Sequence, residues 1–392
     1  MRKQLNIGLF GFGCVGYGLY EVLLKTPSLK GNIKKICVKT RNKTRPISSN
    51  LFTYDKDDIL NDETINVVVE LIDDPDAAFQ IVSQAMKNGK AVVTANKKMI
   101  AEHMQELLAL QELYKVPLLY EASCCASIPI IRNLEEYYDN DLLESIEGVV
   151  NGSTNYILTK TAQDNLSYED ALHQAQEKGF AESNPSLDTG GFDAKYKLLI
   201  LLTHAFGLVV KPNEILNLGI EGLGPLELRF AKEKGFKIKL IAQAYKMENE
   251  QIAAYVLPKF IPISDKLFQV EDEYNGIITK TAFAETQFFM GKGAGAYPTA
   301  SAVLSDISAL AYDYKYEYKK LNQHNQSKLA SEIILKLFTR YDKSNQINME
   351  DYFESISEQY INSHQSYVIG FITLENIAKM NIEQDVFSLL ME

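Results

Sequence analysis

The 392-residue sequence has no tryptophan and only four cysteines, which are Cys14, Cys37, Cys124 and Cys125. None of them has a C-x-x-C spacing, and adjacent cysteines such as Cys124 and Cys125 rarely form a disulfide bond. The sequence therefore predicts neither a zinc site nor a disulfide framework. This cysteine usage is typical of a reducing compartment, so we expect a cytoplasmic protein.

Long apolar runs and excess positive charge are also missing. No stretch reaches the length needed to cross a bilayer, so we expect no membrane partner. The formal net charge of −11 argues against nucleic acid as the main partner, because phosphate backbones are bound by basic surfaces. The opening residues, MRKQLNIGLFGFGCVG, contain too many glycines for a signal peptide and favour a strand that enters a turn.

A glycine pattern follows the first apolar segment. Residues 5–10 (LNIGLF) predict a strand, and Gly11-x-Gly13-x-x-Gly16 leads into an amphipathic helix. In such a turn the first glycine permits the bend, the second admits a pyrophosphate, and the third lets helix and strand pack closely. The amides at the helix start then bind the anion. The expected cofactor contacts are Gly11, Phe12, Gly13, Cys14, Val15 and Gly16.

The second expected strand, NIKKICVKT, ends in cations rather than in the acidic residue that holds the ribose 2′-hydroxyl of NAD. Lys39 lies at its end, and Arg41, Lys43 and Arg45 follow. Positive charge suits a 2′-phosphate, so the sequence favours NADP(H), with NAD(H) as the alternative cofactor. A solvated basic loop would have the same composition.

Strands and helices alternate through residues 65–123, where apolar runs such as TINVVVELI are followed by amphipathic segments. This alternation predicts an α/β fold with a Rossmann-type, doubly wound sheet. In such sheets ligands bind outside the carboxyl ends of the strands. Gly11, Lys39, Lys97 and Glu121 all fall at such ends, which makes Lys97 a candidate active-site cation.

A charged residue precedes the most apolar run of the chain. In LDTGGFDAKYKLLILLTHAF, Lys197 is followed by five leucines and isoleucines, and Asp193 lies four residues earlier on the same helical face. A solvated ion pair at a helix start is one interpretation. The other is a buried lysine that transfers a proton, because burial lowers the pKa of a lysine. His173 and His204 are weaker candidates for a catalytic base.

The rest of the chain predicts a second α+β region and a short tail. Strands are expected at KIKLIAQAYK, QIAAYVLPKFI and NGIITKTAF, in a substrate and dimerisation domain of residues 147–297. A helix at about 298–312 is expected to return to the nucleotide-binding domain of residues 1–146. The polar segment 313–328 is expected to be a linker. Residues 329–392 predict a small α/β module in which MEDYFESISEQYI is a helix.

Six segments, in this order along residues 5–310, together resemble the homoserine dehydrogenase family. They are VVVELI, GKAVVTANKK, YEASCCASIPII, GVVNGSTNYIL, EKGFAESNPSLDTGGFDAKYKLLIL and GKGAGAYPTASAVLSDI. The resemblance implies reversible reduction of L-aspartate 4-semialdehyde to L-homoserine by NAD(P)H. That reaction belongs to the biosynthesis of threonine, methionine and isoleucine. The resemblance further implies that the amino acid binds across a cleft from the nicotinamide, and that the chain forms a homodimer or a larger homo-oligomer.

The resemblance also implies roles for individual residues. Lys197 is the leading acid or base, Lys97 is the second candidate, and Asp193 orients the lysine or contacts the substrate. The expected substrate contacts are Glu182, Asp188, Gly152, Ser153 and Thr154. The expected further cofactor contacts are Thr94, Asn96, Lys97, Gly293 and Ala294.

Some positions depart from the family pattern. After Glu121 the family usually has a glycine-rich loop, EASVGGGIP, where this chain has Cys124-Cys125-Ala126-Ser127. The family holds a monovalent cation there, so Glu121, Cys124, Ala126 and Ile128 are the expected ligands of Na⁺ or K⁺. Asp73 and Asp74 replace a Gly-Gly pair that often follows VELI.

The tail leaves the question of regulation open. Many relatives end in an ACT domain that binds an amino acid such as threonine, usually with an Asp-x-x-Gly turn after its first strand. This chain has YDKSNQIN at that point, which favours a degenerate ACT-like module or a role in dimer contacts. Two other functions remain possible at this stage: an enzyme for a different small aldehyde or hydroxy acid, and a non-catalytic sensor of NADP(H).

Overall fold

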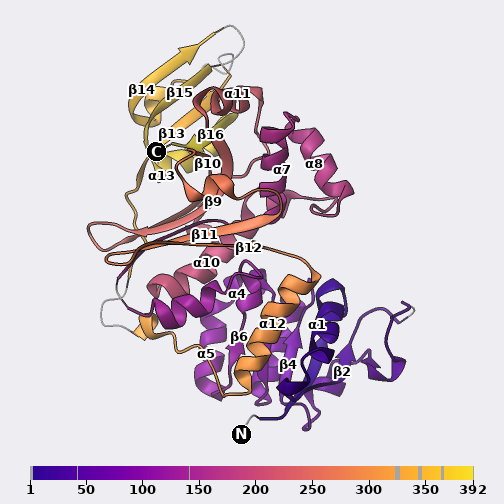
Figure 1. Ribbon diagram of the computed structural model, residues 1–392. Helices are drawn as coiled ribbons and strands as arrows, with labels where there is room; N and C mark the ends of the chain where they lie inside the picture. Colours follow the sequence, from indigo (N-terminus) through magenta and orange to yellow (C-terminus); the bar gives the residue numbers. More distant parts are fainter. Residues whose placement is uncertain are drawn as a thin grey trace. The chain divides into compact units, whose positions relative to one another are not determined.

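The computed structural model describes residues 3–41, 43–140, 142–322, 327–342, 347–362 and 366–391 (Figure 1). The chain divides into two compact units. Unit 1 comprises residues 1–141, 199–209 and 291–324, and unit 2 comprises residues 142–198, 210–290 and 325–392. Two elements have residues in both units, and these are α10 (Phe192–Phe206) and β12 (Glu285–Lys292).

Unit 1 is built on six parallel strands in the order β3-β2-β1-β4-β5-β6. The strands are β1 (Leu5–Phe10), β2 (Gly31–Cys37), β3 (Phe52–Thr53), β4 (Val67–Glu70), β5 (Ala91–Thr94) and β6 (Leu118–Leu119). The chain order reverses between β1 and β4, which is where a doubly wound sheet binds its ligand. The prediction of a Rossmann-type sheet is confirmed.

Helices pack against this sheet, and its central strands are therefore mainly apolar: all four residues of β4 are buried, three valines followed by the acid Glu70. The helices are α1 (Cys14–Leu24), α2 (Asp57–Leu60), α3 (Pro75–Lys87), α4 (Lys97–Glu102), α5 (Met104–Tyr114), α6 (Ile130–Arg132) and α12 (Ala296–Leu310). Short 3₁₀ or π turns are η1 (Pro27–Leu29), η2 (Ser49–Leu51), η3 (Glu121–Ser123), η4 (Asn133–Tyr137) and η7 (Lys319–Asn322).

The start of α3 has the two residues that favour a helix N-terminus, a capping Asp and a Pro at the first position. Asp74 is its N-cap and accepts a hydrogen bond from the amide of Ala77, while Pro75 occupies the first helical position. Asp74 is one of the two acids that replace the family's Gly-Gly pair, so one of these departures has a structural role as a helix cap.

Helix α12 packs beside α1 within unit 1 (Figure 1). The two helices approach closely because Gly18 of α1 has no side chain. A Cβ atom on Gly18 would lie 2.9 Å from the carbonyl oxygen of Ala296, the first residue of α12. Residues 313–322, expected to belong to a linker, are packed into unit 1 instead. Tyr316 is only 3% exposed, and the hydroxyl of Tyr318 lies 3.0 Å from that of Tyr120. Tyrosine occupies every second position of residues 312–318, so one side of this segment is apolar although its overall composition is polar.

Unit 2 contains one ten-stranded mixed sheet in the order β12-β11-β7-β9-β10-β16-β13-β15-β14, with β8 paired to β10. The other strands are β7 (Leu143–Val149), β8 (Leu216–Asn217), β9 (Lys237–Lys246), β10 (Ile252–Ile261), β11 (Tyr274–Thr281), β13 (Ile334–Tyr341), β14 (Phe353–Ile361), β15 (Ser366–Thr373) and β16 (Val386–Leu390). The other helices are α7 (Gly152–Gln163), α8 (Tyr168–Glu177), α9 (Ser186–Thr189), α11 (Pro225–Lys234) and α13 (Leu374–Glu383), with 3₁₀ turns η5 (Pro212–Glu214), η6 (Lys266–Gln269) and η9 (Met349–Asp351).

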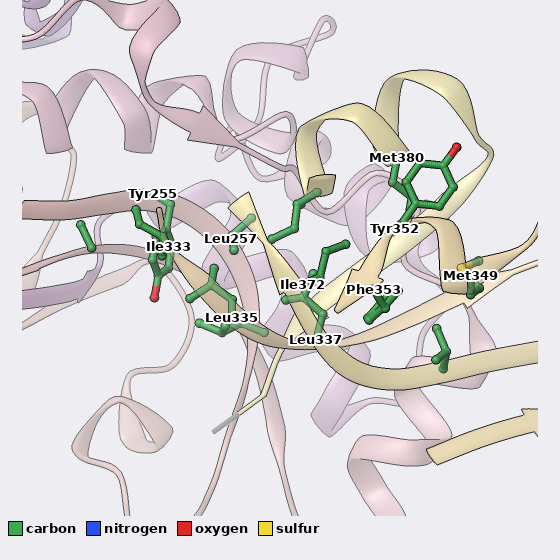
Figure 2. Close-up of a cluster of buried hydrophobic side chains, with 14 of the residues drawn as sticks. Tyr255, Leu257, Ile333, Leu335, Leu337, Met349, Tyr352, Phe353, Ile372 and Met380 are labelled. Carbon is green, nitrogen blue, oxygen red and sulfur yellow. The ribbon is translucent and has the colours of Figure 1, made fainter. Parts of the chain in front are cut away.

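The C-terminal segment shares its core with the substrate sheet. Figure 2 shows Tyr255 and Leu257 of β10 gathered with Leu335 and Leu337 of β13 in one apolar cluster. Strand β16 also pairs with β10 through Lys259 and Leu390. Residues 327–342, 347–362 and 366–391 therefore extend unit 2 instead of forming a separate core.

The helix predicted at MEDYFESISEQYI is wrong. Residues 349–351 form a 3₁₀ turn, and residues 353–361 form strand β14, which pairs antiparallel with β15. The apolar residues Phe353, Ile356 and Tyr360 are spaced three and four apart, which mimics a helical face. Pairing with a neighbouring strand overrides that local pattern.

No helix among the residues that the structure describes has the length and apolar character required to span a bilayer.

Candidate active site

The glycine turn has the geometry that a pyrophosphate requires. Gly11 has φ 90°, and a Cβ atom there would lie 2.4 Å from the carbonyl oxygen of Leu71. A Cβ atom on Gly16 would lie 2.5 Å from the carbonyl oxygen of Gly11. At Gly13, the N-cap of α1, nothing lies within 4 Å of that position, so a phosphate has room to approach the helix start. Phe12, Cys14 and Val15 complete the turn.

The cations after β2 lie beside this turn. Phe12 contacts Phe52 edge to face at 5.2 Å, and the Arg45 guanidinium lies 4.9 Å from the Phe52 ring. Arg45 also donates to the carbonyls of Thr40 and Lys43, which holds the loop together. Lys39 is exposed. Stacking and hydrogen bonds thus hold Arg45 near the dinucleotide turn.

The turn after β5 begins with Thr94, which is fully buried, and continues to Lys97, the first residue of α4. The side chain of Asn96 caps α4 by accepting from the amide of Met99 at 3.0 Å. Thr94 donates its hydroxyl proton to Glu70 at 2.5 Å. Thr94 and Asn96 thus hold the turn, while Lys97 is half-buried at the carboxyl end of the sheet.

A second glycine-rich segment, residues 291–295, also lies in unit 1. Gly293 and Ala294 precede α12, and the hydroxyl of Tyr297 donates to Glu21 of α1 at 2.6 Å. Together with the close approach of Gly18 to Ala296, this contact places the segment against the helix that follows the dinucleotide turn.

Glu121 lies after β6 and is only 2% exposed. Its two carboxylate oxygens accept the amides of Ile131 and Arg132, each at 2.9 Å. Burial raises the pKa of Glu121 to about 8, and the nearby carboxylate of Asp306 contributes to this shift. The Arg132 guanidinium donates to Asp306 at 2.9 Å, yet burial raises the pKa of Asp306 to about 6.

The loop after Glu121 has an unusual backbone. Cys125 has φ 54° and Ala126 has φ 37°, so both occupy the left-handed region at the positions where the family pattern has glycine. The loop shape survives the loss of glycine, at a cost of roughly 1 kcal/mol per residue. In the part of the chain that the structure describes, no three His, Cys, Asp or Glu side chains are grouped to bind a metal ion.

Unit 2 gathers a buried polar cluster around the expected lysine. Lys197 is 6% exposed, and its ammonium donates to Asp193 at 2.7 Å and to the carbonyl of Val150 at 2.7 Å. The ion pair is therefore buried, and the interpretation as a solvated pair is wrong. The pair lies on the first turns of α10, as the spacing of four residues predicts.

Asn151 joins the cluster and was missed by the sequence reasoning. Its side-chain amide donates to Asp193 at 2.8 Å and to Asp188 at 2.6 Å. Its side-chain oxygen caps α7 by accepting the amide of Thr154 at 2.8 Å. An asparagine before Gly-Ser-Thr is a helix N-cap signal that could have drawn attention to it.

The remaining expected substrate residues differ in burial and in their hydrogen-bond partners. The hydroxyl of Ser153 donates to the carbonyl of Phe180 at 2.6 Å, and the hydroxyl of Thr154 donates to Asn151. A Cβ atom on Gly152 would lie 2.7 Å from the carbonyl of Glu273, so only glycine fits there. Glu182 is exposed, and its carbonyl accepts from Gln176. Asp188 belongs to the cluster through its bond to Asn151, whereas Glu182 is exposed.

The two histidines have structural surroundings. His204 is buried between Glu135, at 2.6 Å, and the hydroxyl of Tyr120, at 2.8 Å. His173 is exposed and lies 3.6 Å from Glu177 on the surface of α8. Neither histidine belongs to the lysine cluster.

Comparison with known proteins identifies the family. A family model of homoserine dehydrogenase matches residues 129–308, and a model of the homoserine dehydrogenase NAD binding domain matches residues 11–121. The homoserine dehydrogenase of Helicobacter pylori is 38% identical over 319 residues, which are 79% of this chain and 75% of that protein. The chain belongs to the homoserine dehydrogenase family.

Solved structures agree with this assignment. A homoserine dehydrogenase from Thiobacillus denitrificans has a TM-score of 0.87 at 27% identity, covering 100% of this chain and 98% of that one. A hyperthermophilic archaeal homoserine dehydrogenase in complex with NADPH has a TM-score of 0.70 at 26% identity, covering 80% of this chain and 99% of that one. The chain is an NAD(P)-dependent oxidoreductase of amino-acid biosynthesis. The alternatives of another aldehyde substrate and of a non-catalytic sensor are set aside.

The position of Asn151 leads to the first prediction. Asn151→Ala removes two hydrogen bonds to carboxylates, so kcat of the homoserine dehydrogenase reaction should fall at least roughly tenfold, the effect of one charge-assisted bond. It also removes a helix cap, which should lower stability by about 1 kcal/mol. Steady-state kinetics and thermal unfolding measure the two effects.

Ser167→Ala is the matched control, because Ser167 caps α8 by accepting the amide of Asp170 and lies outside the cluster. It should lose similar stability and keep its kcat. Equal kcat values for Asn151→Ala and the wild type would contradict the role of Asn151.

Proposed function

We propose that the cluster of Lys197, Asp193, Asn151 and Asp188 binds the amino-acid substrate and that Lys197 is the acid and base of the reaction. The observation that carries this proposal is the buried ammonium, held by one carboxylate and one carbonyl. A charge in such a low-dielectric site interacts far more strongly with a developing oxyanion than one in water. Lys97, in unit 1, is the second cation.

When bound, NADPH would provide the hydride that reduces the aldehyde carbon of aspartate semialdehyde. Lys197 donates a proton to the carbonyl oxygen as negative charge develops, and it accepts that proton from the homoserine hydroxyl in reverse. Asp193 orients the ammonium and stabilises it as an ion pair. Lys97 is the second candidate for the acid or base.

Other contacts of the amino acid follow from charge. The substrate ammonium needs acceptors, and Asp188 supplies one within the cluster, with Glu182 as a contact from the neighbouring loop. The substrate carboxylate needs donors, and the amides of Gly152 and Ser153 at the start of α7 offer them. Ser153 and Thr154 contribute through the backbone, because their hydroxyls bond to Phe180 and Asn151.

We propose NADP(H) as the preferred cofactor, with Thr94, Asn96, Lys97, Gly293 and Ala294 on the nucleotide side of the site. The preference is supported by Lys39, Arg41 and Arg45, which follow β2 where an NAD site has an acidic residue. The Arg41 guanidinium lies 5.0 Å from the centre of the Tyr54 ring and that of Arg45 lies 4.9 Å from the centre of the Phe52 ring, and these cations would suit a 2′-phosphate.

We also propose a monovalent cation, Na⁺ or K⁺, bound by Glu121 and by the carbonyls of Cys124, Ala126 and Ile128. The donor set fits, since oxygen ligands suit alkali cations and the left-handed residues turn the loop backbone sharply. Burial raises the pKa of Glu121 to about 8, and a bound cation would favour its charged form. Its expected effect is structural, on the loop after β6.

A homodimer or larger homo-oligomer, working in the cytoplasm, completes the proposal. Strand β12 is at the end of the sheet order, and Phe283 and Met290 near it are 84% and 54% exposed. Exposed apolar side chains at a sheet edge favour association with another chain. All four cysteines are free thiols, which fits a reducing compartment. The shared core suggests that the C-terminal segment, expected as a degenerate ACT-like module, supports the substrate sheet.

Lys197→Ala should abolish turnover and leave NADPH binding nearly intact, because Lys197 belongs to the substrate cluster. Turnover is followed by NADPH absorbance, and binding by fluorescence titration. Lys259→Ala is the control, since Lys259 forms a comparably buried ion pair with Glu147 in the same unit. Parallel loss of turnover and NADPH binding in Lys197→Ala would mean that this lysine is structural.

Lys39→Ala should weaken NADPH more than NADH, because only NADPH carries the 2′-phosphate. Loss of one charge-assisted contact predicts a roughly tenfold change in the ratio of the two dissociation constants. Lys34→Ala, on the exposed side of β2, serves as the control and should leave the ratio unchanged. A constant ratio in Lys39→Ala would refute the proposed preference.

The cation should be visible in stability. At matched ionic strength, Na⁺ or K⁺ should raise Tm over choline by roughly 3 °C, which corresponds to about 1 kcal/mol for a domain of this size. Glu121→Gln should lose this difference, whereas Glu147→Gln should keep it. Identical Tm values of the wild type in Na⁺, K⁺ and choline would speak against the site.

A further inference from the structure

Glu70 is a fully buried carboxyl group at the carboxyl end of β4. It is paired in register with Thr94, the last residue of β5. One carboxylate oxygen accepts the amide of Ile72 at 2.6 Å, and the other accepts the hydroxyl of Thr94 at 2.5 Å. Glu70 therefore connects the turn after β4 to the end of β5.

The hydrogen bonds close into a ring. The hydroxyl oxygen of Thr94 accepts the amide of Asn96 at 3.0 Å. The side-chain amide of Asn96 donates to the carbonyl of Ile72 at 3.2 Å. The ring thus runs from Glu70 through Thr94, Asn96 and Ile72 back to Glu70. Neither turn can shift without breaking one of these bonds.

This ring determines where α4 begins. Asn96 is the N-cap, and its side-chain oxygen accepts the amide of Met99 while its side-chain nitrogen belongs to the ring. Lys97 is the first residue of α4. The position of Lys97 at the start of α4 therefore depends, through Asn96 and Thr94, on the carboxylate of Glu70.

The turn after β4 also adjoins the dinucleotide turn. The amide of Leu71 donates to the carbonyl of Phe10 at 2.8 Å. A Cβ atom on Gly11 would lie 2.4 Å from the carbonyl oxygen of Leu71 and 3.3 Å from Ile72. The backbone that Glu70 holds is thus the surface against which Gly11 packs.

We propose that Glu70 is a positioning residue for the homoserine dehydrogenase reaction, which holds the Lys97 turn and the turn behind Gly11 in one arrangement. Glu70 acts through these turns and does not itself touch the reacting atoms. The inference rests on the proposed role of Lys97 in catalysis.

The chemistry of the site explains why the residue is an acid. Two donors, an amide and a hydroxyl, converge on the side chain, and a carboxylate accepts both. Glutamine accepts only one, because its NH₂ group opposes the other donor. Burial raises the pKa of Glu70 to about 7, while the bonds from Thr94 and Ile72 oppose that shift. A buried acid without a cationic partner among these contacts costs stability, and such groups concentrate at functional sites.

Glu70→Gln is the direct test, since it preserves size and removes one of the two hydrogen bonds. We expect kcat to fall roughly tenfold, as for the loss of one charge-assisted bond. The dissociation constant of NADPH should change less, by under about threefold, because Gly11 and Gly13 bind through the backbone. Amide hydrogen exchange of peptides covering residues 94–100 should accelerate.

Glu227→Gln is the control for a general loss of stability. Glu227 is also fully buried and accepts the amide of Gly224 and the guanidinium of Arg340, in unit 2. This variant should lower Tm at least as much as Glu70→Gln, with an unchanged kcat. A Glu70→Gln enzyme that loses Tm but retains kcat would overturn the inference.

A double-mutant cycle tests the ring. Thr94→Val should reduce kcat, and the double variant with Glu70→Gln should be no slower than the slower single variant, because both break one chain of bonds. Fully additive losses of kcat would contradict the ring.

If Lys97→Ala retains turnover, the proposed role of Lys97 fails. Unchanged exchange of residues 94–100 in Glu70→Gln would instead show that Glu70 does not hold the turn.

Discussion

A buried ion pair between Lys197 and Asp193 is the interaction on which the proposed substrate site depends. The two side chains are 7% and 4% exposed, and removing two charges from water is expensive unless further hydrogen bonds compensate. The fold of unit 2 supplies them: the carbonyl of Val150 accepts from Lys197, and the amide of Asn151 donates to Asp193. Both residues follow β7, so the start of α7 and the start of α10 stabilise one another. The ammonium to which we assign the proton transfer is thereby held in a place that water hardly reaches.

The proposed cofactor site depends on different interactions from those of the lysine cluster. In unit 1 the groups expected to meet the cofactor are mainly backbone amides, made accessible by Gly11 and Gly13 and placed at a helix start. Positive charge is contributed by Lys39, which follows β2, and by Lys97, which follows β5. The carboxylate of Glu70 links the turn after β4 to the end of β5, from which the chain continues to Lys97. The proposed cofactor site in unit 1 thus relies mainly on backbone amides, whereas the proposed substrate site in unit 2 relies on charged side chains.

Local patterns in the sequence predicted much of this architecture. The glycine turn, the capped helix α3, the strands β9 to β11 and the spacing of Asp193 and Lys197 all depend on residues near one another in the chain. The bridging role of Asn151 could not be predicted, because its bonds span 37 and 42 residues. The same holds for Ser153, whose hydroxyl was expected at the substrate but bonds to Phe180. Strand β14 was mistaken for a helix because its pairing partner β15, not its own spacing, determines its conformation.

The most direct measurement of the central claim is a crystal structure of this chain with NADP⁺ and L-homoserine bound. The account predicts that the hydroxyl oxygen of homoserine lies at hydrogen-bond distance, roughly 2.7–3.2 Å, from the ammonium nitrogen of Lys197. It also predicts that Asp193 still pairs with Lys197 and that Asp188 contacts the substrate ammonium. Homoserine bound with its hydroxyl away from Lys197, and with the cluster unchanged and unoccupied, would contradict the account.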